Sequence, residues 1–159
     1  MTTYPTSTAP AAKSWLFGQM QSTLTAATGF TFQLGYATNE GTLDNPDDMV
    51  WLGKVANRQV KPFAMVGDQG AFSTAEAYDL EVTVSCYRAG EGYQPGIDAE
   101  TRAWVLVGVI ETIQRTDPTM GGVLWTSRPN ASDADVDWDD SGNGRVCTIP
   151  LSFHCEAVI

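Results

Sequence analysis

Residues 78–87 read Tyr-Asp-Leu-Glu-Val-Thr-Val-Ser-Cys-Tyr, and this stretch decides the fold class. Apolar and polar side chains alternate through it without a break, which is the period of a strand that buries one face. Val, Thr and Tyr are also residues that strands favour. We therefore predict a half-buried strand here, with Tyr78, Leu80, Val82, Val84 and Cys86 facing the core.

The chain after this strand predicts a long helix and a closing hairpin. Residues 98–115 have apolar residues at helical spacing, with Asp98 as the N-cap, and Asp117-Pro118 ends the helix. Gly and Asn in residues 140–144 predict a hairpin turn. Pro150 indicates a sheet edge or a bulge. The predicted segments are a loop at 89–97, the helix at 98–115, and strands at 121–128, 136–139 and 145–159.

The chain before the central strand is less regular. Residues 1–10 are rich in Thr, Ser and Pro and predict a flexible N-terminal arm. Pro62 marks its strand as an edge or a bulge. The predicted segments are a helix at 11–27, strands at 30–36, 49–55 and 59–66, and a loop at 67–75.

This order of elements predicts a single α+β domain over residues 11–159. Its sheet is largely antiparallel, with two main helices packed on one face. A chain of 159 residues buries enough surface to fold without a disulfide or a metal.

The charge balance excludes several classes of partner. The chain has 9 Lys and Arg against 19 Asp and Glu, for a net charge of -10. Binding by phosphate neutralisation needs a basic face, and docking on an anionic membrane needs basic residues. The longest strongly apolar run, residues 103–110, is too short to span a bilayer, and no signal peptide is seen. We expect a protein that is made in the cytoplasm and stays there or assembles into a particle.

The nucleophilic and metal-binding residue types do not form a recognisable site. Cys86, Cys147 and Cys155 all fall in predicted strands, where we expect buried small hydrophobic residues. His154, the one histidine, alternates onto the face opposite Cys147 and Cys155. We expect no enzyme activity, no cofactor and no metal.

Carboxylates are the most conspicuous polar feature. Asp79 and Glu81 share one face of the central strand, as exposed strand residues often do. Residues 137–148 partly match a calcium loop, but Thr148 stands where that loop needs a bidentate Glu. We predict that alternating aspartates form the acidic side of the hairpin, with Ala134, Val136 and Trp138 inward. These acidic candidates, for a lumen or an outer surface, are Asp133, Asp135, Asp137, Asp139 and Asp140.

The predicted main helix has more apolar residues than one buried face requires. Trp104, Val105, Val107 and Val109 lie off the face that carries Leu106 and Ile110. A helix that is apolar nearly all round is buried on more than one side. Either a second layer of the same subunit or another subunit covers it. Our candidates for a subunit interface are Trp104, Val105 and Val109.

The second half of the chain resembles the tail terminator (tail-completion) proteins of long-tailed bacteriophages. The likeness rests on an alternating strand, a long helix, the segment Arg115-Thr116-Asp117-Pro118-Thr119-Met120-Gly121-Gly122, a strand and an acidic hairpin. The N-terminal amphipathic helix fits as well, so residues 11–36 and 77–159 carry the resemblance. Residues 37–75 do not follow the pattern.

This resemblance implies a structural protein of the virion. The family forms a hexameric ring at the head-proximal end of the tail tube, where it ends tube polymerisation and offers a surface for joining the head. The implied partners are further copies of the chain, the tail tube protein and the head-tail connector protein. DNA passes through the lumen without sequence-specific binding, and a negative lumen suits that passage. Alternative interpretations are another neck or tail-tube component, a small-molecule or sugar-binding domain, and, least favoured, a hydrolase.

Overall fold

Three long antiparallel strands form the centre of the sheet. The computed structural model describes residues 7–37, 45–66, 71–130, 133–138 and 143–159. In it, β2 (Asp48–Val66) pairs antiparallel with β3 (Ala71–Ala89), and β3 pairs antiparallel with β6 (Gly144–Val158).

Three short strands complete the six-stranded sheet. On one side, β1 (Phe32–Gly35) runs parallel to the beginning of β2. On the other side, β4 (Thr126–Pro129) and β5 (Asp135–Trp138) each pair antiparallel with a different part of β6. The predicted largely antiparallel sheet is confirmed.

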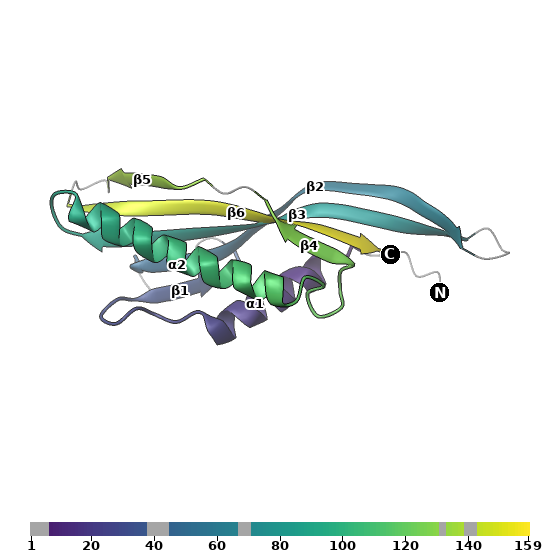
Figure 1. The fold of residues 1–159 in the computed structure, drawn as a ribbon, viewed down its shortest axis with the longest axis horizontal. Coiled ribbons are helices and arrows are strands. Elements are labelled where there is room, and N and C mark those ends of the chain that lie inside the picture. Colours follow the sequence, from purple (N-terminus) through teal and green to yellow (C-terminus); the bar gives the residue numbers. More distant parts are fainter. Residues whose placement is uncertain (1–6, 38–44, 67–70, 131–132, 139–142) are drawn as a thin grey trace.

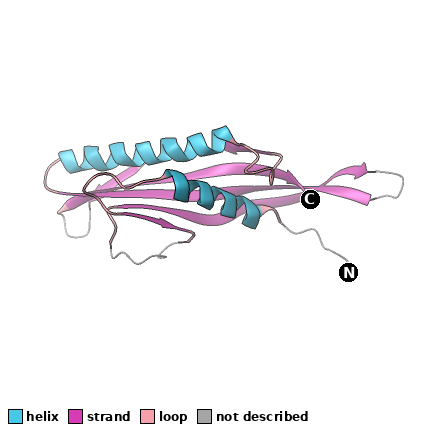
Figure 2. Ribbon diagram, turned by 90° about the horizontal axis from the view of Figure 1, so that it is seen from below, coloured by secondary structure: helices cyan, strands magenta, loops and turns pink. Residues whose placement is uncertain are grey.

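Both helices cover the same face of this sheet. α1 (Ala9–Thr23) and α2 (Gln94–Thr116) lie along the strands (Figures 1 and 2). Every second residue is buried from Glu76 to Arg88 in β3 and from Arg145 to Ala157 in β6, as the alternation in residues 78–87 predicts. The chain therefore forms a single α+β domain. The largest fully buried apolar side chains are Tyr78, Phe153, Leu16, Met20, Leu52, Leu80, Leu106, Ile110, Met120, Ile149 and Val50.

The β2–β3 hairpin extends beyond the helix-covered part of the sheet (Figure 1). β1 pairs with β2 only as far as Trp51, and β6 pairs with β3 only from Ala75 onward. We call residues 54–66 and 71–77 the hairpin arm. Its base packs against the core through Val55 and against the start of α1 through Glu76, and its outer part extends beyond the helices. The register of β2 shifts three times between Leu52 and Ala64, so the arm is a bulged and twisted ribbon.

The helix boundaries differ from the sequence prediction. α1 begins at Ala9, inside the predicted arm, because Pro10 is well tolerated in a first helical turn, and residues 1–6 lie outside the described part. It ends at Thr23, where Leu24 turns to extended backbone. α2 begins at Gln94, four residues before the predicted Asp98 cap, again with Pro95 in the first turn.

Several strand boundaries also differ. The predicted strands 49–55 and 59–66 are one bulged strand, and β3 starts at Ala71 inside the predicted loop 67–75. The predicted strand 121–128 is mostly a turn, and only β4 is extended. Pro150 pairs with Thr83 without a bulge, but it lies between the parts of β6 that pair with β5 and β4.

A buried ion cluster joins the end of the sheet to α2. Asp48 is fully buried, and its carboxylate accepts hydrogen bonds from Arg88 Nη1 at 2.7 Å and Arg102 Nε at 2.8 Å. Arg102 Nη2 also donates to the carbonyl of Thr25 at 2.7 Å, and the Arg88 guanidinium lies over the Phe30 ring. One carboxylate thus connects β2, β3, α2 and the segment after α1.

We predict that Asp48→Ala lowers the free energy of unfolding by about 3–5 kcal/mol, because it leaves two guanidinium groups without their buried counter-ion. Urea unfolding at neutral pH measures the change. Glu91→Ala, which removes an exposed carboxylate, is the control and should change stability by less than about 0.5 kcal/mol. Equal effects of the two substitutions would contradict this role of Asp48.

Candidate subunit interface

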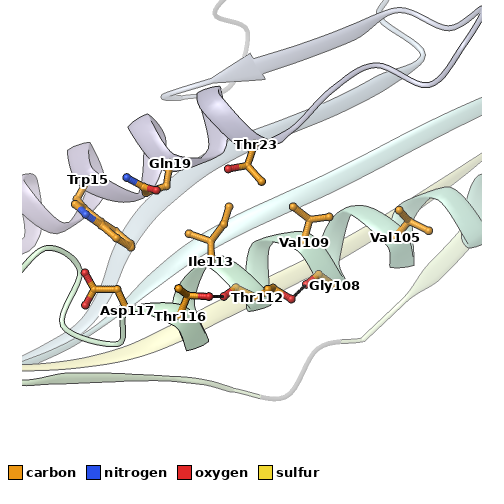
Figure 3. A pocket seen from close by; sticks show the side chains of 10 residues that line it. All are labelled: Trp15, Gln19, Thr23, Val105, Gly108, Val109, Thr112, Ile113, Thr116 and Asp117. Carbon is orange, nitrogen blue, oxygen red and sulfur yellow. Dashed lines mark hydrogen bonds between the residues drawn. The ribbon is translucent and has the colours of Figure 1, made fainter.

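A groove runs between α1 and α2 on the outside of the helical layer (Figure 3). Its volume is about 740 Å³. Figure 3 shows Trp15 and Asp117 at one end and Val105 at the other. The lining residues are Trp15, Gln19, Thr23, Val105, Gly108, Val109, Thr112, Ile113, Thr116 and Asp117.

Two threonines of α2 make this groove more apolar than its sequence suggests. Thr112 Oγ1 donates to the carbonyl of Gly108 at 2.7 Å, and Thr116 Oγ1 donates to the carbonyl of Thr112 at 2.8 Å. Their hydroxyls are thus bonded to their own helix. Such a surface favours apolar partners over water.

Gly108 has no packing role that the described residues explain. A Cβ built at this position meets no heavy atom within 4 Å. Glycine inside a helix costs about 1 kcal/mol relative to alanine. A groove floor without a side chain allows another backbone to approach α2 closely.

The segment that carried the family resemblance forms one end of the groove. Asp117 Oδ1 accepts from Thr119 N and Oγ1, and Asp117 Oδ2 accepts from Gly121 N at 2.8 Å. Hydrogen bonds from the Thr119 hydroxyl and the Gly121 amide hold the pKa of Asp117 below its usual value. Met120, at the tip, is fully buried. The segment is thus a turn that is closed by hydrogen bonds between its own residues, and it leads the chain from α2 toward β4.

This turn lies directly against the indole of Trp15. A Cβ on Gly121 would stand 2.7 Å from Trp15 Cδ1, whereas a Cβ on Gly122 would meet no atom within 4 Å. Both glycines have positive φ, +74° and +80°. Alanine substitutions at the two positions therefore separate two destabilising effects. Both substitutions strain the backbone, but only the one at Gly121 also overlaps Trp15.

We predict that Gly122→Ala destabilises the fold by about 1–2 kcal/mol, the cost of a left-handed conformation for a residue with a Cβ. Gly121→Ala should cost a further 1–3 kcal/mol, roughly, because the new methyl group overlaps the indole. Urea unfolding of the two variants measures the difference. Equal destabilisation by the two substitutions would mean that Gly121 does not pack closely against the Trp15 indole.

The interface residues proposed from sequence have three different environments. Trp104 and Val105 are 42% and 51% exposed, large values for apolar side chains. Val105 and Val109 line the groove, and Val109 is half-buried against the core. Val107, expected off the core face, is buried. Whether Trp104, Val105 and Val109 contact another subunit stays a prediction.

The acidic candidates are only partly within the described residues. Asp133 and Asp135 are exposed, and Asp137 belongs to β5. Asp139 and Asp140 lie outside the described residues. Ala134 is exposed, so the prediction that it points inward is wrong, and it precedes the paired part of β5.

A buried carboxylate that the sequence analysis missed fixes the start of α1. Glu76 Oε2 accepts from Thr8 N at 2.9 Å and Thr8 Oγ1 at 3.0 Å, and Glu76 Oε1 accepts from Arg58 Nε at 2.6 Å. Burial acts to raise its pKa, but hydrogen bonds from Ser7, Thr8 and Arg58 outweigh burial and hold the pKa below 4.5. The sequence could have predicted its burial, because Glu76 lies on the same strand face as the core residues Tyr78 and Leu80.

We predict that Glu76→Gln lowers the free energy of unfolding by about 2 kcal/mol at pH 7, because bonds to a charged acceptor are lost. The folded-state pKa is lowered, so the carboxylate stabilises the fold above pH 4.5 and loses this effect as the pH falls through the folded-state pKa. The two proteins should therefore converge below pH 4.5 in urea unfolding. A difference that is independent of pH would contradict this role.

Three polar side chains, Asp79, Asn57 and His154, form a network on the outer face of the sheet. Asp79 Oδ1 lies 2.8 Å from His154 Nδ1, and Asn57 Nδ2 donates to Asp79 Oδ2 at 2.8 Å. Burial acts to raise the pKa of Asp79, but the bonds from Asn57 and His154 hold it below 3.8. The three cysteines lie on the opposite, buried side, as predicted.

The described residues contain no group of three or more His, Cys, Asp or Glu side chains arranged to hold a metal ion. Burial, with Glu100 and Asp135 nearby, raises the pKa of Cys147 to about 11, so this thiol stays protonated at neutral pH. None of the described helices combines the length and the apolar character that crossing a bilayer takes.

Comparison with known proteins gives no further assignment. No family model matches the chain, and no curated protein matches it.

Proposed function

We propose that the chain is a structural subunit of a phage tail-terminator-like ring. In this proposal, copies of the chain close into a ring of six subunits, as in the family it resembles, at the head-proximal end of the tail tube. The ring ends tube polymerisation and joins the head-tail connector protein. DNA passes through its lumen without sequence-specific binding, and the chain has no catalytic role.

The observation that carries this proposal is the apolar outer surface of α2. Trp104 and Val105 leave large apolar side chains in water, and the groove beside them is lined mainly by apolar atoms. Exposed apolar surface of this kind marks interaction sites in soluble proteins. Gly108 adds a place where a second backbone could approach.

The fold and the charge are compatible with this role. A single α+β domain with an extended hairpin arm offers separate surfaces for two neighbours, and a head-to-tail interface between identical subunits can close into a ring. The net charge of -10 keeps passing DNA from binding tightly.

The groove also supports a second candidate function, a binding domain for a small apolar molecule. Its volume of about 740 Å³ falls within the usual range of ligand sites. In that case the isolated protein is a monomer that binds its ligand between α1 and α2. Another neck component or a tail-tube protein remains an alternative of the same class as the ring.

Negative-stain microscopy with light-scattering mass on the same sample tests the proposal. Closed rings of uniform subunit number support the terminator, long tubes favour a tube protein, and a monomer favours the ligand-binding domain. We predict that Trp104→Glu/Val105→Glu abolishes ring formation and leaves a folded monomer, because two charges then face the apolar interface.

A matched control changes the same residue types on another surface. Trp125 and Val158 are 62% and 45% exposed, and both line a surface hollow that shares no lining residue with the groove between α1 and α2. Trp125→Glu/Val158→Glu should leave ring formation intact. If the α2 variant assembles as the wild type does, the interface does not include Trp104 and Val105.

A further inference from the structure

Cations are concentrated in the second half of β2. Three of the nine Lys and Arg residues lie within residues 54–61, and no Asp or Glu occurs between Asp48 and Asp68. These three cations, Lys54, Arg58 and Lys61, all belong to the hairpin arm, and we call them the basic segment. The rest of the chain is more acidic than the net charge suggests.

At the opposite end of the molecule, the exposed charged side chains among the described residues are acidic. Glu91 lies between β3 and α2, Asp98 and Glu100 are in the first turns of α2, and Asp135 is in β5, and all four are exposed. We call these four residues the acidic end. Figure 1 shows β5 and the start of α2 at one end of the long axis and the hairpin arm at the other.

The arginines near the acidic end bind groups of the same chain. Arg88 and Arg102 bind the buried Asp48, and Arg145 donates to the carbonyls of Gly144 and Gly92. No salt bridge between described residues includes any member of the acidic end. Glu100 is in α2 and Asp135 is in β5, and these two elements are in contact.

The basic segment keeps cations available to a partner. Lys54 is 3.9 Å from Glu81, and both side chains are largely in solvent, so this pair binds weakly. Lys61 is exposed. Arg58 is different, because it binds the buried Glu76 and holds the arm to α1.

We propose that the basic segment of one copy docks on the acidic end of a second copy. This inference rests on the self-assembly proposed above and names the contact. Copies with a net charge of -10 repel one another at long range. Placing Lys54 and Lys61 against Glu100 and Asp135 of the neighbour offsets that repulsion and fixes the direction of assembly, because complementary charges set register.

Two charge-reversal variants test the contact. Lys54→Glu/Lys61→Glu makes the arm acidic, and Glu100→Lys/Asp135→Lys makes the acidic end basic. Each variant alone brings like charges together, so the concentration for half-assembly should rise about tenfold or more. An equimolar mixture restores opposite charges at every contact and should assemble near the wild-type concentration.

Arg115→Glu is the control for a charge reversal outside both charged surfaces. Arg115 is exposed in the last turn of α2 and belongs to neither charged surface. This variant should assemble like the wild type. Salt gives a second readout, because screening weakens the like-charge repulsion in each reversal variant, so the half-assembly concentrations of these variants should approach that of the wild type as NaCl is raised.

The outcomes separate this inference from the proposed function. If the wild type forms rings and both reversal variants do so equally well, the charge contact is wrong and the ring stands. Failure of the mixture to assemble, when both folded variants fail alone, also overturns the contact. A wild type that stays monomeric at all concentrations overturns the ring and the contact together.

Discussion

The rest of the structure depends on the need to bury one face of β3 and β6. Their inward residues are apolar at nearly every second position, and both strands lie in the interior of the sheet. A sheet with one such face needs a second layer, and α1 and α2 supply it. The opposite face stays polar, with Asp79, Asn57 and His154 joined by hydrogen bonds.

Two buried carboxylates attach the helices to this sheet at different places. Asp48 binds Arg88 and Arg102 and so joins α2 to β2 and β3. Glu76 binds Thr8 and Arg58 and so joins the start of α1 to the hairpin. Apolar packing alone tolerates many helix positions, whereas ionic contacts between named partners select one. The groove lies between the two helices that are attached in this way.

The proposed functions follow from apolar and charged side chains that the fold leaves exposed. The helical layer covers the sheet, but the outer side of α2 keeps Trp104 and Val105 in water and Gly108 without a packing neighbour. The hairpin arm carries cations that the body of the same copy does not neutralise fully. Both features support the proposed self-assembly, and both are open to direct tests of assembly.

The local pattern of apolar residues determined most helices and strands, whereas contacts between distant residues decided the candidate interface. The alternation in residues 78–87 predicted the buried face, and the spacing of Leu106 and Ile110 predicted the core side of α2, because period alone fixes which side chains share a face. Sequence could not join β2 into one bulged strand or end the strand predicted at 121–128, since bulges and turns depend on their neighbours. Only the tertiary structure brought Glu76 to Thr8, Asp48 to Arg102 and Trp15 to Gly121, because those partners are far apart along the chain and meet only when the layers pack.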